Sequence, residues 1–164
     1  MADGTRAGIW FIVAATGGYK RKEFVMAKVA VVYWSGTGNT EAMATCVAEG
    51  VTDKGGAAEM IQCSDFGADK IGEYDAIAFG CPAMGSEELE YDEFQPMWDD
   101  VKGELYDKPV ALFGSYEWAD GEWMENWKAD ADEAGLNVVD TVIAYDAPDD
   151  DAQAACRELG AKLA

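Results

Sequence analysis

The stretch that decides the fold is residues 28–40, "KVAVVYWSGTGNT". It opens with a short apolar and β-branched run, which is typical of a strand buried on both faces of a parallel sheet. A glycine-rich loop follows directly. Apolar residues at helical spacing then continue to a glycine pair at residues 55–56. A buried strand, a glycine loop and a helix in this order predict the opening unit of an α/β domain.

The same alternation continues to the end of the chain. We expect strands over residues 28–34, 57–63, 74–83, 108–115 and 137–145. Helices are expected over residues 40–55, 91–105, 121–135 and 149–164. Five strands alternating with helices predict one domain over residues 26–164, with a parallel sheet covered by helices on both faces. In such a sheet ligands bind beyond the carboxyl ends of the strands.

Residues 1–25 read differently from the rest of the chain. Their apolar run "GIWFIVAA" is far too short to cross a bilayer, although it resembles a weak signal sequence. Met26 begins "MAKVAVVYWS", which is a good start for a domain that opens on a strand. We therefore expect residues 1–25 to be an unstructured N-terminal extension or the product of a misassigned start site.

Charge and residue types exclude several functions. The 164-residue chain has a formal net charge of -20, which argues against nucleic acid and anionic membranes as partners and favours proteins with basic docking faces. The excess of acidic residues is also explained if it keeps the protein soluble or if the host is adapted to salt. There is no histidine, and the four cysteines include no C-x-x-C pair, so no metal site is expected. Reduced, mostly buried thiols and a cytoplasmic location are the resulting expectations.

The loop "WSGTGNT", residues 34–40, has the character of a phosphate site that lacks a cation. Glycines free backbone N–H groups to point inward, and the start of the following helix adds a positive dipole end. The neutral donors of the loop are Ser35, Thr37, Asn39 and Thr40. An ordinary strand-to-helix turn is the alternative interpretation.

Two further loops leave strand ends with unusual compositions. "CPAMGSEELE", residues 81–90, places a glycine close to a soft methionine and a carboxylate, but taken alone this loop is better interpreted as a solvated acidic turn. "SYEWADGEW", residues 115–123, presents Trp118 in a segment too polar for the core. Such a tryptophan either stacks on a flat ring or folds back onto its own helix. Because all three loops follow parallel strands, we expect them to meet at one edge of the molecule.

Together the motifs "VVYWSGTGNTEAMA", "GCPAMGSEELE" and "LFGSYxWxxGEWM" resemble the short-chain flavodoxins of anaerobic bacteria. The resemblance covers about residues 27–164. It implies a flavodoxin-like three-layer sandwich with strand order 2-1-3-4-5, noncovalently bound FMN and single-electron transfer between semiquinone and hydroquinone at low potential. Implied partners are reductases, pyruvate oxidoreductase-type enzymes and hydrogenases, and we expect the chain to be a monomer.

Carried over by motif, the resemblance assigns the FMN contacts. The phosphate would lie in residues 35–40 beside Trp34, the isoalloxazine between Met84 and Trp118, and the flavin N3–H against Glu87. The Gly85 peptide would rotate on reduction so that its carbonyl meets N5–H. The full set of expected cofactor contacts is Trp34, Ser35, Gly36, Thr37, Gly38, Asn39, Thr40, Ala83, Met84, Gly85, Ser86, Glu87, Ser115, Tyr116, Trp118 and Gly121.

Two positions of this chain depart from the family pattern. The family commonly has glycine on both sides of the stacking tryptophan, where this chain has Glu117 and Ala119. If either position requires a positive φ, strain of about 1 kcal/mol follows.

A receiver domain is disfavoured because its acidic residues are missing from the strand ends. An FMN-dependent NAD(P)H:quinone reductase would need an open face above the flavin, and a flavin-storage protein would accumulate no semiquinone.

Overall fold

The computed structural model describes residues 26–164, so the expectation for residues 1–25 lies outside the described residues. The described chain forms five strands, β1 Lys28–Tyr33, β2 Ala57–Gln62, β3 Ala76–Gly80, β4 Pro109–Tyr116 and β5 Asn137–Tyr145. Its α-helices are α1 Asn39–Asp53, α2 Phe94–Val101, α3 Glu122–Glu133 and α4 Asp150–Leu163. Three short 3-10 helices, η1 Cys63–Asp65, η2 Ala68–Glu73 and η3 Lys102–Glu104, complete the fold.

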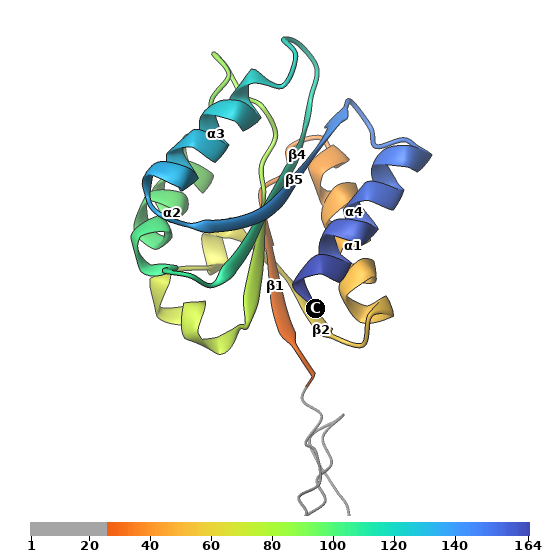
Figure 1. Ribbon diagram of the computed structural model, residues 1–164. Coiled ribbons are helices and arrows are strands. Elements are labelled where there is room, and N and C mark those ends of the chain that lie inside the picture. Colours follow the sequence, from red (N-terminus) through yellow and green to blue (C-terminus); the bar gives the residue numbers. More distant parts are fainter. Residues whose placement is uncertain (1–25) are drawn as a thin grey trace, which may run out of the picture.

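The five strands form one parallel sheet in the order β2-β1-β3-β4-β5. Helices α1 and α4 cover one face, and α2 and α3 cover the other (Figure 1). This is the predicted flavodoxin-like three-layer sandwich. Its switch point lies between β1 and β3, where the strand order reverses, so the carboxyl ends of these strands are the expected ligand edge.

The central strands carry the core. Val29, Ala30, Val31 and Val32 of β1 are completely buried, as the continuous apolar run predicts for a strand covered on both faces. The edge strands β2 and β5 instead bury one residue each, and their other residues are half-buried or exposed. Within residues 26–164 no helix is long and apolar enough to cross a membrane.

Helices α1 and α4 approach each other through glycine. A Cβ placed on Gly50 of α1 would overlap the Arg157 carbonyl of α4, and one on Gly160 of α4 would overlap the Val47 carbonyl of α1. Backbone therefore packs on backbone, which side chains at these positions would prevent. The contact fixes α1, and with it the loop that precedes α1.

The helix expected over residues 91–105 is shorter than predicted. Helix α2 begins at Phe94 because the Glu90 carboxylate accepts hydrogen bonds from the N–H groups of Asp92, Glu93 and Phe94, at 2.8–2.9 Å. These are N–H groups that a helix start leaves without intrahelical partners. The last turn tightens into η3.

Asp130 joins the two helices on the α2–α3 face. Its carboxylate accepts from Trp98 Nε1 at 2.8 Å and from Lys102 Nζ at 3.0 Å. Burial alone would raise the pKa of Asp130, but these two hydrogen bonds, together with the lysine charge, hold it below the usual 3.8.

Candidate functional site

The three loops singled out in the sequence converge where the strands end, at the top of Figure 1. Between them lies a pocket of about 200 Å³. Its walls are formed by Trp34, Ser35, Gly36, Thr37, Thr40, Pro82, Ala83, Met84, Ser115, Tyr116, Glu117 and Trp118. These walls contain no lysine or arginine, and their one charged side chain is the Glu117 carboxylate.

Ser35 organises the glycine loop. Its Oγ accepts from the N–H of Gly38 at 3.1 Å and from the N–H of Glu41 at 3.2 Å. Gly38 has φ +99°, a conformation suited to glycine, and α1 starts at the next residue. Since Ser35 Oγ only accepts in these bonds, its O–H proton remains available for a ligand.

Neighbouring loop residues tie the glycine loop to other strand ends. The buried Thr40 places Oγ1 3.4 Å from Ser115 Oγ at the end of β4. Asn39 donates from Nδ2 to Asp146 Oδ1 at 3.2 Å, just beyond β5. Among the described residues, the backbone N–H groups of Thr37, Asn39 and Thr40 meet no acceptor. These N–H groups and the helix dipole are able to hold an anion.

Trp34 forms the wall beside the glycine loop. A Cβ on Gly36 would lie 3.0 Å from the Trp34 ring, so the loop backbone packs directly on the indole. The indole Nε1 donates to Oε1 of Glu93 at 3.0 Å. Glu93 is the residue that precedes α2.

The second loop is a tight turn. Met84 and Glu88 exchange two backbone hydrogen bonds of 2.9 Å, which closes a loop over Gly85, Ser86 and Glu87. Gly85 has φ +48° and Glu87 has φ +60°. A Cβ on Gly85 would meet nothing within 4 Å, so this side of the turn is open.

Glu87 provides a test of whether a ligand fits. Its Oε1 accepts from the Trp123 N–H at the start of α3, at 3.1 Å. Its Oε2 is buried and has no partner among residues 26–164. An unpaired buried carboxylate oxygen is unfavourable, so a donor supplied by a ligand would satisfy it.

The third loop carries the exposed aromatic residue. Trp118 is 52% exposed, whereas Trp123, five residues later, is buried with Nε1 donating to the Cys81 carbonyl. Tyr116 is partly buried and lies against the rings of Trp123 and Tyr145, at centroid distances of 5.7 and 5.6 Å. Trp118 is therefore not folded back as a core residue, and a face of its ring is open to a flat partner.

Of the two departures in this loop, Ala119 has the unusual backbone. Its φ is +60°, and Gly121 nearby has φ +90°, whereas Glu117 is not in the left-handed region. The conditional prediction of strain thus applies to Ala119. Glu117 instead adds its carboxylate to the pocket wall.

The predicted contacts divide into three groups. Ten line the pocket: Trp34, Ser35, Gly36, Thr37, Thr40, Ala83, Met84, Ser115, Tyr116 and Trp118. Gly38, Asn39, Gly85 and Gly121 shape its loops without lining it, and Ser86 and Glu87 border a neighbouring hollow beside α3. Pro82 lines the pocket although it was not predicted, and its place in the second motif was the available signal. Asp146 was missed because its role depends on a contact 107 residues away.

The cysteines take no part in the pocket. All four are buried and unpaired, as predicted. Burial raises the pKa of the Cys63 thiol to about 12 and also raises the pKa of Cys81. These thiols are therefore protonated and unreactive at neutral pH.

Sheet topology and pocket together define a class: an α/β protein with an aromatic-walled pocket at the carboxyl edge of its sheet, beside a glycine loop whose free N–H groups suit an anion. Comparison with known proteins agrees with this class. The family model described as Flavodoxin matches residues 31–160. A flavodoxin of Megasphaera elsdenii is 45% identical over 132 residues, which cover 80% of this chain and 95% of that protein.

Further relatives extend the comparison. A flavodoxin of Clostridium beijerinckii is 41% identical over 134 residues, which cover 82% of this chain and 97% of its own. The solution structure of two-electron reduced Megasphaera elsdenii flavodoxin superposes with a TM-score of 0.77 at 44% identity, and the match covers 82% of this chain and 97% of that one. The chain belongs to the flavodoxin family. It is an FMN-binding electron carrier rather than an enzyme, and its partners are redox proteins.

Proposed function

We propose that this chain carries single electrons at low potential, cycling between the one-electron and two-electron reduced states of its FMN. The observation that supports this most strongly is the composition of the pocket wall, which contains Glu117 and no lysine or arginine. FMN, when bound, would supply two successive one-electron reductions, and the second would leave negative charge on the ring. A carboxylate and the absence of a cation disfavour that charge and lower the second potential.

The proposed placement of the cofactor follows the donors. Ser35 O–H and the N–H groups of Thr37, Asn39 and Thr40 would hold the phosphate, because the described residues leave these donors without acceptors. Glu87 Oε2 would accept the flavin N3–H, which would satisfy its buried oxygen. Met84 and the exposed Trp118 would cover the two faces of the ring.

Gly85 would supply the switch between reduction states. Its positive φ and the absence of a Cβ suit Gly85 to more than one backbone conformation, and a Cβ placed there would meet nothing within 4 Å. The two hydrogen bonds between Met84 and Glu88 would hold the ends of the turn during such a rotation. A mobile peptide within a fixed turn can present either its N–H or its C=O to the cofactor.

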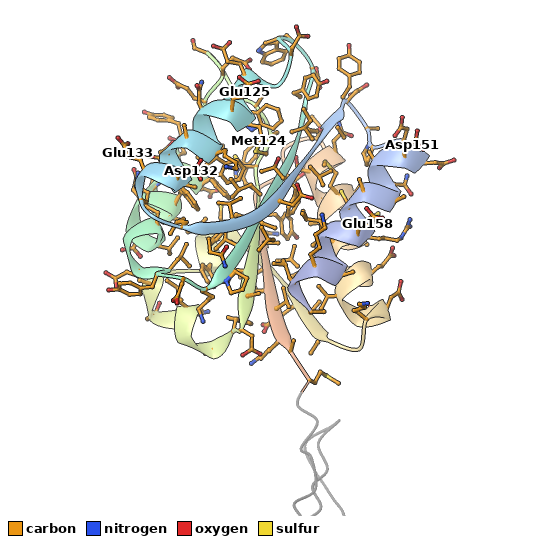
Figure 2. All side chains as sticks on the ribbon, in the orientation of Figure 1. Met124, Glu125, Asp132, Glu133, Asp151 and Glu158 are labelled. Carbon is orange, nitrogen blue, oxygen red and sulfur yellow. The ribbon has the colours of Figure 1, made fainter. Side chains whose placement is uncertain are left out.

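The acidic surface supports redox partners with basic docking faces, such as reductases, pyruvate oxidoreductase-type enzymes and hydrogenases. The outward-pointing carboxylates of α3 and α4, among them Glu125, Asp132 and Asp151, illustrate this surface (Figure 2). Electrostatic attraction of this kind raises association rates and weakens with salt.

A spectroelectrochemical titration of the FMN-loaded protein tests the proposed cycle. We expect two separated one-electron steps, with the singly reduced form accumulating to most of the protein between them. A single two-electron step with no intermediate absorbance would refute the proposal. Rapid NADPH oxidation with quinone by the purified protein alone would favour the reductase alternative.

A further inference from the structure

We propose that Glu93 is a positioning residue for the phosphate loop, acting through the indole of Trp34. Glu93 was not among the residues predicted to contact the cofactor, and it does not line the pocket. The inference rests on the placement of the FMN phosphate in residues 35–40 described above. Its basis is a series of contacts that runs from the start of α2 to the backbone of Gly36.

The first contact fixes Glu93 itself. The N–H groups of Glu93 and Phe94 both donate to Oε1 of the buried Glu90, each at 2.8 Å. Glu90 is only 7% exposed, and its own N–H donates to Sγ of Cys81, the residue that follows β3. The start of α2 is therefore tied to the central sheet rather than free to move.

The second contact orients the indole. Trp34 Nε1 donates to Glu93 Oε1 at 3.0 Å, across 59 residues of sequence. The indole has one N–H donor, so this bond selects one rotation of the ring about its side-chain torsions. A hydrogen bond with a charged acceptor is stronger than one between neutral groups.

The third contact transfers that orientation to the phosphate loop. The Trp34 ring lies so close to Gly36 that a Cβ there would be 3.0 Å from the ring. Gly36 is followed by Thr37, whose N–H is one of the donors assigned to the phosphate. If the indole rotates, it no longer supports the loop backbone, and the N–H donors of the loop no longer point toward one position.

The negative charge of Glu93 and its role as a hydrogen-bond acceptor predict opposite effects on FMN binding, so substitutions can separate them. Removing the Glu93 charge alone should strengthen the binding of a phosphate dianion, because one repulsion disappears. Removing the hydrogen-bond acceptor should weaken it. Glu93→Gln removes the charge and keeps an acceptor oxygen, whereas Glu93→Ala removes both.

The experiment measures dissociation constants of FMN and of riboflavin, which lacks the phosphate, for the full-length apoprotein and its variants. Glu133→Ala serves as the control, since this exposed carboxylate lies at the far end of α3 from the loops (Figure 2). We expect Glu93→Ala to bind FMN about three- to tenfold more weakly, consistent with the loss of one charge-assisted hydrogen bond. Riboflavin binding should change much less, and Glu93→Gln should bind FMN at least as tightly as the wild type.

A second readout follows the indole directly. The Trp34 Nε1–H resonance, assigned by its absence in Trp34→Phe, should move upfield in Glu93→Ala and stay close to its wild-type position in Glu133→Ala. If Glu93→Ala binds FMN as tightly as the wild type, or if both Glu93 variants bind it more tightly, the inference is wrong. If the wild type itself does not prefer FMN over riboflavin, the proposed phosphate placement fails instead.

Discussion

Glu117 provides the most informative single substitution, because it is the one charged side chain in the pocket wall. Glu117→Gln keeps the size and polarity of the side chain and removes its charge. The negative charge that the second electron adds to the flavin would then meet less repulsion. We therefore expect the second reduction potential to rise. The first potential should change less, because the first reduction adds no net charge to the flavin when a proton follows the electron.

The size of the shift follows from Coulomb's law. At a separation on the order of 10 Å and an effective dielectric constant between about 40 and 80, one charge contributes ~0.4–0.8 kcal/mol. For a one-electron couple this corresponds to about 20–35 mV. Glu117→Gly, which restores the residue common in the family, should shift the potential in the same direction.

Spectroelectrochemistry on the FMN-loaded wild type and variants measures this shift. Glu133→Gln is the matched control, because Glu133 ends α3 about 16 Å of helix away from the helix start next to the third loop. At ~0.1 M salt, charges separated by more than ~10 Å are largely screened, so the control should leave both potentials unchanged. A second potential that is unchanged or lower in Glu117→Gln would refute the argument that the carboxylate in the wall sets the potential.

Three further predictions concern stability and are each checked by denaturant or thermal unfolding. Gly160→Ala should destabilise the protein by about 3 kcal/mol, because the added Cβ forces α1 and α4 apart. Gly103→Ala is the control and should change stability little, since a Cβ there meets nothing within 4 Å. Equal effects of the two substitutions would contradict the close packing. Ala119→Gly should stabilise by about 0.5 kcal/mol, since relief of the positive φ outweighs the greater freedom of glycine in the unfolded chain, and a clear loss would contradict this. The folded pKa of Asp130 lies below 3.8, so its ionised form contributes stability that is complete above about pH 3.8 and is lost as the pH falls through the folded value. Asp130→Asn should therefore lose less stability over that range than the wild type. Identical acid profiles for the two proteins would contradict the assignment.

The sequence predicted those features that depend on local pattern. The continuous apolar run of β1 and the alternation of strands and helices were enough for the sheet and its layers, since a parallel sheet covered on both faces has few arrangements. The three loops met at one edge because parallel strands end there together. Trp118 was recognised as a surface aromatic from the polarity of its neighbours.

Features that depend on distant contacts were out of reach. The start of α2 is set by the Glu90 carboxylate, which accepts from three N–H groups, and nothing in the local period indicates this. The Asn39–Asp146 and Trp34–Glu93 hydrogen bonds join residues 107 and 59 positions apart. A positive φ at Ala119 was posed as a condition, and only the folded backbone answers it.

The central claim is that uncharged donors hold the FMN phosphate inside a strongly acidic protein of net charge -20. The most direct measurement is the salt dependence of FMN and riboflavin dissociation constants between about 0.05 and 0.5 M salt, a range over which screening increases strongly. Without a cation at the phosphate, the repulsion from a net charge of -20 outweighs the short-range attraction of the helix dipole, and salt screens both, so FMN binding should tighten with salt relative to riboflavin. FMN binding that weakens with salt relative to riboflavin would show that an attractive positive charge holds the phosphate, and the account would be wrong.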